Sequence, residues 1–149
     1  MTREIAAAVD VAAELVTGPV RLCGHSAGGH LVARLACRDV MCRAKDRVAR
    51  IVPISPVSDL RCLLKAVMNA TLRLDAVEAA AESPVLHAAP DVPVTVWVGA
   101  EERPVFLDHA RWLAEAWSAS HRVDPGRHHF DVIDGLCEAG SPLIREILA

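Results

Sequence analysis

Aromatic residues are scarce in this chain of 149 residues, which has no tyrosine and only 3% aromatic side chains in all. Proteins that bind single-stranded nucleic acids stack the bases on aromatic side chains, so this scarcity argues against a base-binding surface. The net charge of −3 also argues against such a surface, because protein surfaces that bind nucleic acids are basic. We therefore expect no nucleic-acid partner.

Long apolar runs are missing as well, and none approaches the length that a bilayer crossing needs. The N-terminal segment carries Arg3, Glu4 and Asp10 and lacks the continuous apolar stretch of a secretory signal. The chain is nevertheless 52% apolar, which is enough to build a core, and its length suits one domain. We expect a single soluble domain over residues 1–149, in the cytoplasm and without membrane contact.

Sequence motifs that bind cofactors or metals are also missing. GxGxxG and the phosphate-loop GK[ST] do not occur, and the five cysteines form neither a CxxC pair nor zinc-finger spacing. His25 and His30 stand five residues apart, but no carboxylate or third ligand accompanies them, which favours a structural role over a metal site. We predict no cofactor, no metal and reduced thiols, with Cys23 as a buried strand residue.

Apolar strand-like runs alternate with amphipathic segments along the chain. The predicted strands are Val20–Cys23, Arg50–Val57, Val92–Val98 and a short one around His121–Val123; the predicted helices are Thr2–Thr17, Ala27–Arg38, Phe106–Trp117 and Leu143–Leu148. The residues from 58 to 90 are predicted as short helices over one end of the sheet. Such alternation is typical of a parallel sheet between helices, so we predict an α/β fold, a three-layer sandwich with a mainly parallel sheet.

The stretch PVRLCGHSAGGH, residues 19–30, is the most informative about function. It is typical of a strand, a sharp turn and a helix, and residues 24–28 match GxSxG, in which small residues flank a serine held in a strained turn. Ser26 is therefore the candidate nucleophile. The helix that follows presents backbone N–H groups where an oxyanion would form, so the N–H of Ala27 is the predicted donor.

A nucleophilic serine requires a histidine base and a carboxylate that orients the base. In parallel sheets such groups gather at the carboxyl ends of strands. Glu101 and Glu102 follow the strand at 92–98, and His128 and His129 follow the last predicted strand. The order serine, acid, histidine is that of α/β-hydrolases. The residues alone do not choose between His128 and His129, and Glu101 also fits a solvated position.

Three stretches resemble the C-terminal portion of α/β-hydrolases of the kynurenine formamidase-like esterase group. They are GHSAGGHL from Gly24, GAEERPVF from Gly99 and PGRHHFDVI from Pro125, and the resemblance spans nearly the whole chain. In that family the acid precedes a residue and a proline, and the base precedes phenylalanine, which implies Ser26, Glu102 and His129 as the catalytic triad. It also implies a small ester or formamide as substrate, with N-formylkynurenine suggested by the resemblance alone.

The chain departs from that family in two respects. Family members usually carry aspartate at the position of Glu102, although glutamate also serves in this fold. They also begin with further strands and an HGG-type loop that donates a second oxyanion N–H, and this sequence has no such stretch. We therefore predict a truncated hydrolase fold with Val20–Cys23 at a sheet edge, through which two copies pair, and feeble hydrolysis. The alternative is a non-catalytic remnant or subunit.

Overall fold

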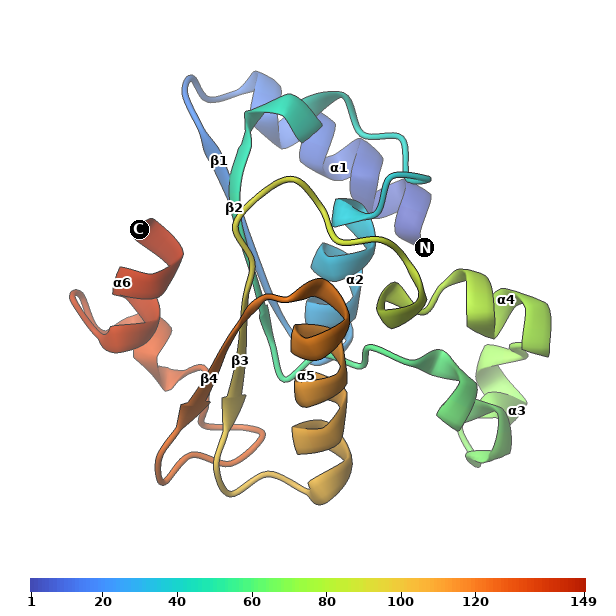
Figure 1. The fold of residues 1–149 in the computed structure, drawn as a ribbon. Helices are drawn as coiled ribbons and strands as arrows, with labels where there is room; N and C mark the ends of the chain where they lie inside the picture. The colour runs from blue at the N-terminus through green and yellow to red at the C-terminus, as the bar shows by residue number, and fades with distance from the viewer.

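The protein forms a parallel sheet of four strands, in the order β1-β2-β3-β4 (Figure 1). The computed structural model describes residues 1–149. The strands are β1 (Val20–His25), β2 (Val48–Ile54), β3 (Thr95–Gly99) and β4 (Ser120–Asp124). The predicted α/β fold is confirmed. The third strand begins later than predicted, because Val94 makes only an isolated bridge to Ile51 before regular pairing starts.

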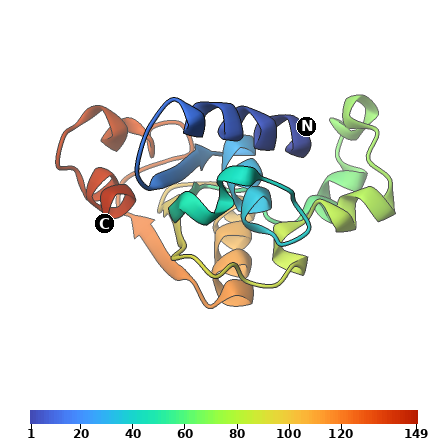
Figure 2. The same cartoon turned by 90° about the horizontal axis from the view of Figure 1, so that it is seen from above.

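Six α-helices and four short 3-10 helices connect and cover the strands. The α-helices are α1 (Thr2–Glu14), α2 (Ala27–Ala36), α3 (Asn69–Leu72), α4 (Ala76–Ala81), α5 (Pro104–Trp117) and α6 (Pro142–Leu148); the 3-10 helices are η1 (Arg43–Arg47), η2 (Leu60–Lys65), η3 (Pro84–Leu86) and η4 (Asp134–Cys137). The predicted short helices between residues 58 and 90 are present, and α3 and α4 project from the body of the molecule (Figure 2).

Helices α2 and α5 cover one face of the sheet, and α6 covers the other (Figure 1). On the first face, Val32 of α2 and Leu113 of α5 belong to the same buried cluster as Ile51 of β2. On the second face, Leu143 and Ile147 of α6 pack in a cluster with Val52, Ile54 and Trp97 of the central strands, together with Val132. The three layers of the prediction are therefore observed, and the central strands are apolar on both sides.

A serine and a proline mark the beginning of helix α6. The hydroxyl of Ser141 accepts a hydrogen bond from the N–H of Ile144 at 3.1 Å, and Pro142 occupies the first turn. None of the helices combines the length and the apolar character that a membrane crossing requires.

Strand β1 lies at the edge of the sheet, as predicted for Val20–Cys23. The prediction that Cys23 is buried is wrong: its side chain is exposed. Strand β1 pairs only with β2. The edge position therefore leaves Cys23 open to solvent.

Candidate active site

Ser26 occupies the sharp turn between β1 and α2. Its backbone has φ 57° and ψ −114°, a conformation that residues other than glycine rarely adopt and that costs about 1–3 kcal/mol. The N–H of Ser26 donates to the carbonyl of Ile54 at 2.9 Å, which ties the turn to the end of β2. The strained serine predicted from GxSxG is therefore present, at the carboxyl end of its strand.

Two glycines allow the turn to close, and only one of them is a glycine of the motif. A Cβ atom on Gly24 would lie 2.3 Å from the carbonyl oxygen of Gly28, and one on Gly29 would lie 2.8 Å from the carbonyl oxygen of Ile54. A Cβ atom on Gly28 itself would meet nothing within 4 Å. The close approach of helix to strand thus requires Gly24 and Gly29, whereas the motif pointed to Gly24 and Gly28.

The structure brings Ser26, His129 and Glu102 into one chain of hydrogen bonds. Nε2 of His129 lies 3.1 Å from Oγ of Ser26, and Nδ1 of His129 lies 2.7 Å from Oε2 of Glu102. The Glu102 side chain is fully buried, and that of His129 is 16% exposed. Because a carboxylate only accepts hydrogen bonds, Nδ1 carries the proton, and Nε2 is free to accept one from the serine hydroxyl. The arrangement has the connectivity of a nucleophile, a base and an orienting acid.

Glu102 is itself held by groups from two strand ends. Its Oε1 accepts hydrogen bonds from the hydroxyl of Ser55 and from the N–H of Gly99, the latter at 3.1 Å. Ser55 directly follows β2 and is buried, with a positive φ of 47°. Ser55 was not among the predicted site residues. The signal that points to it is its place immediately after a buried strand, where groups of a site gather in parallel sheets.

The imidazole of His129 packs against two further rings that were not predicted to belong to the site. Phe106 of α5 stacks on it, with ring centroids 4.0 Å apart and planes 26° from parallel. The ring of His25, at the end of β1, lies 4.6 Å away and is tilted by 44°. Phe130, which follows the base in sequence, meets it edge-on at 5.5 Å and is mostly exposed.

The alternative candidates lie elsewhere. His128 is half exposed, and its Nδ1 accepts a hydrogen bond from the N–H of Phe130 at 3.1 Å. Glu101 points into solvent. His30 does not meet His25, because its Nε2 bonds with the carbonyl of Glu82 at 2.7 Å. Of the two histidines and two glutamates that the sequence left open, the structure places His129 and Glu102 beside Ser26.

Ala27, the predicted oxyanion donor, is the first residue of α2. The first N–H groups of a helix have no acceptor within the helix, so the N–H of Ala27 is available at the turn. It adjoins the serine whose attack would generate the negative charge.

One group of side chains has the composition of a metal site. Ligand atoms of Cys37, Asp39 and His87 lie within 4.8 Å of one another. The Asp39 carboxylate, however, accepts two hydrogen bonds from Arg34, at 2.9 and 3.1 Å. The guanidinium already balances the charge of this carboxylate, which makes the group a structural ion pair rather than a centre for chemistry.

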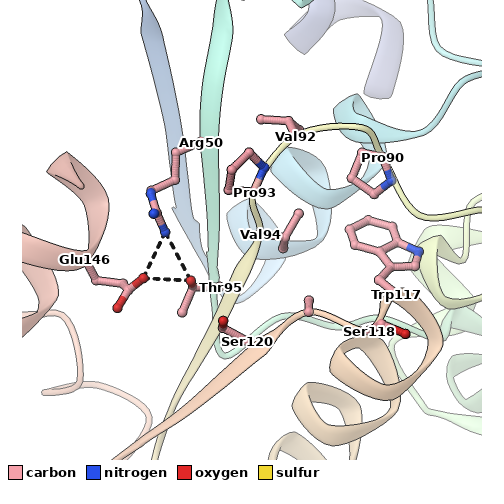
Figure 3. A pocket seen from close by; sticks show the side chains of 11 residues that line it. Arg50, Pro90, Val92, Pro93, Val94, Thr95, Trp117, Ser118, Ser120 and Glu146 are labelled. Atoms are coloured by element: carbon pink, nitrogen blue, oxygen red, sulfur yellow. Dashed lines mark hydrogen bonds and ion pairs between the residues drawn. The ribbon is translucent and has the colours of Figure 1, made fainter.

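A cavity of about 400 Å³ opens at the other end of the strands from Ser26 (Figure 3). It lies at the amino ends of β3 and β4, where Arg50, Thr95 and Glu146 bond with one another. Arg50 and Thr95 both donate to Oε1 of Glu146, at 2.9 and 2.7 Å. Because these three side chains satisfy one another's hydrogen bonds and lie far from Ser26, the cavity is not the candidate active site.

No protein-family model matches the chain. Among solved structures, it is similar to a protein from Silicibacter sp. TM1040 that is described as a candidate thioesterase, with 50% identity and a TM-score of 0.96. The neighbours are hydrolases of the α/β type. The comparison covers 99% of this chain and 57% of the Silicibacter protein, so the chain spans little more than half the length of this relative.

Two further neighbours are esterases or related hydrolases. An esterase from Thermogutta terrifontis is 27% identical, with a TM-score of 0.50 over 73% of this chain and 45% of its own. An acetyl ester-xyloside bifunctional hydrolase from Caldicellulosiruptor lactoaceticus is 17% identical, with a TM-score of 0.62 over 98% of this chain and 60% of its own. At this identity the second likeness shows the fold alone. The kynurenine formamidase-like identity stays a prediction.

Proposed function

We propose that this chain carries the catalytic groups of a serine hydrolase that acts on small carboxylic esters or formamides. The observation that supports it most directly is the hydrogen-bonded series Ser26, His129 and Glu102 at the carboxyl ends of three strands. The esterases and the candidate thioesterase among its structural neighbours support an ester substrate. No cofactor enters the proposal.

In the proposed reaction, Oγ of Ser26 attacks the carbonyl carbon of the substrate while its proton passes to Nε2 of His129. The new C–O bond moves the carbonyl π electrons onto oxygen, and the N–H of Ala27 donates to that oxyanion. The tetrahedral intermediate then expels the alcohol, thiol or amine, which takes the proton from Nε2. Water repeats the sequence on the acyl-serine and releases the acid. Glu102 fixes the tautomer and stabilises the imidazolium throughout.

Two substrate classes refine the proposal. A formamide of the N-formylkynurenine kind follows from the resemblance of GHSAGGHL and PGRHHFDVI to kynurenine formamidase-like proteins. An acyl thioester is favoured by the Silicibacter neighbour, which is 50% identical over 99% of this chain. Both classes present a carbonyl that the same serine would attack, and they differ in the group that leaves.

A fluorophosphonate probe tests the nucleophile directly. We expect it to label the purified chain, and Ser26→Ala to abolish labelling while Ser120→Ala, a change at an exposed serine of β4, leaves it intact. Hydrolysis of a nitrophenyl acetate, an acetyl thioester and an N-formyl arylamine on the same preparation then ranks the substrate classes. Labelling that persists in Ser26→Ala would overturn the assignment.

The rival proposal is a non-catalytic remnant that keeps the three side chains without turnover. It predicts a folded chain, by circular dichroism, that neither reacts with the probe nor hydrolyses any of the three substrates. Labelling that depends on Ser26 and His129 together would exclude it.

A further inference from the structure

His25 contacts the proposed base from a position fixed by the nucleophile. It is the last residue of β1 and immediately precedes Ser26, whose strained conformation sets the direction of the turn. Its ring centroid lies 4.6 Å from that of His129, although the two residues are more than a hundred positions apart in the chain. A displacement of the His25 ring would therefore open a space directly beside the imidazole that takes the serine proton.

The chemistry of the His25 ring points to packing rather than proton transfer. Its Nε2 is buried and has no hydrogen-bond partner. Burial, and next the neighbouring His129, lower the pKa of His25, so the ring is neutral around pH 7. The titratable groups that act on it are His129 and Glu102, while Phe106 and Phe130, the other rings beside His129, are uncharged. A neutral ring whose Nε2 has no partner, and which hydrogen-bonds with the backbone of His129, contributes its surface and its shape to the position of that residue.

We propose that His25 is a positioning residue: together with Phe106 it holds the imidazole of His129 in the orientation that directs Nε2 at Ser26 and Nδ1 at Glu102. The proposal rests on the proposed serine-hydrolase function for its catalytic consequence, but the packing itself does not depend on that function. The two hydrogen bonds of His129 fix the direction of its ring within the plane, and the neighbouring rings limit rotation out of that plane. Small misplacements of a catalytic group can cost about 10²-fold in rate.

The test compares substitutions that keep or remove the ring at position 25. We expect His25→Phe to retain activity within about threefold, because it preserves an aromatic surface and the lost Nε2 has no partner. His25→Gln and His25→Leu remove the ring, and we expect kcat to fall about tenfold or more with little change in KM. His121→Leu changes a histidine on the exposed strand β4 and serves as the matched control.

Proton NMR of the imidazole ring of His129, assigned with His129→Gln, gives a readout that does not need activity. The rings of Phe106 and His25 shift the Cε1–H signal of His129 by ring currents. His25→Leu removes one of these rings and should change the chemical shift of that signal. His25→Phe keeps a ring at position 25, so the signal should still show a ring-current shift. If the unaltered chain shows no labelling that depends on Ser26, the proposed function fails while the NMR comparison still decides the packing. An unmoved His129 signal in His25→Leu, or a loss of activity in His25→Phe as large as in His25→Leu, would overturn the proposal.

Discussion

Nδ1 of His129 lies 2.7 Å from Oε2 of Glu102, whose side chain has no exposed surface. A buried carboxylate needs hydrogen-bond donors for both of its oxygens. His129 supplies one, and Ser55 and Gly99 supply the others. Groups of the protein therefore hold the Glu102 side chain in place without a substrate.

This relationship predicts the effect of Glu102→Gln. The amide keeps the size of the side chain, but both oxygens of Glu102 accept hydrogen bonds, so an NH₂ group in either position faces a donor. The tautomer of His129 is then no longer fixed. In triads of this kind such a change costs up to about 10⁴-fold in kcat, and we expect a loss of at least about 10²-fold here. Glu101→Gln, at the exposed neighbouring position, is the matched control in the same ester assay. Equal rates for Glu102→Gln and Glu101→Gln would remove Glu102 from the proposed mechanism.

Gly24→Ala and Gly28→Ala should differ sharply although both change a glycine of GxSxG. A Cβ atom at residue 24 would overlap the Gly28 carbonyl at 2.3 Å, and the contact is with backbone that cannot easily move. We expect Gly24→Ala to lower the free energy of unfolding by about 2–3 kcal/mol. Gly28 lies in α2 with open space around it, so Gly28→Ala should raise the free energy by about 0.5–1 kcal/mol. Urea unfolding measures both, and a Gly28→Ala variant less stable than Gly24→Ala would contradict the geometry.

His109 makes stability depend on pH. Burial lowers the pKa of this histidine, and its Nδ1 accepts the backbone N–H groups of Ser58 and Asp59 at 3.2 and 3.3 Å. In the unfolded chain the imidazole takes a proton at about pH 6.5, whereas the folded protein holds it neutral to lower pH. The unfolded state thus binds more protons below about pH 6.5, and stability falls as the pH drops through that range toward the folded pKa.

We therefore expect a lower urea midpoint at about pH 5 than at about pH 7.5. His109→Asn keeps an acceptor but does not titrate, so it should lower stability at about pH 7.5 by about 2–4 kcal/mol and flatten the pH dependence. Burial also lowers the pKa of His25, His30 and His121, so part of the slope should remain. A slope unchanged in His109→Asn would show that these other groups carry all of it.

The unpaired edge of β1 predicts self-association, because exposed strand edges recruit further strands. Cys23 is exposed on this strand. We expect light scattering to show dimers or larger species, and Cys23→Lys to reduce them by placing a charge at the edge. Cys137→Lys, at another exposed cysteine outside the sheet, is the control. A chain that stays monomeric at every concentration, or equal association in both variants, would exclude pairing through β1.

The local patterns of the sequence predict most of the fold, because each element carries its own signal. The apolar run ending at Val98 and the serine flanked by glycines place β3 and the turn within a few residues. Burial of Cys23 was mispredicted because whether other elements cover a strand residue depends on partners distant in sequence. For the same reason Ser55 and Phe106 were missed, since only the assembled sheet brings them to Glu102 and His129.

Helix α6 has a consequence for how the chain acquires its structure during synthesis. Leu143 and Ile147 of this helix cover Val52 and Ile54, which emerge from the ribosome about ninety residues earlier. Until then the face of β1 and β2 that α6 will cover stays apolar and open. Contacts this distant in sequence slow folding and leave intermediates prone to aggregate. The hydrogen bond between His129 and Ser26 spans 103 positions, so the candidate site also depends on a contact between residues distant in sequence.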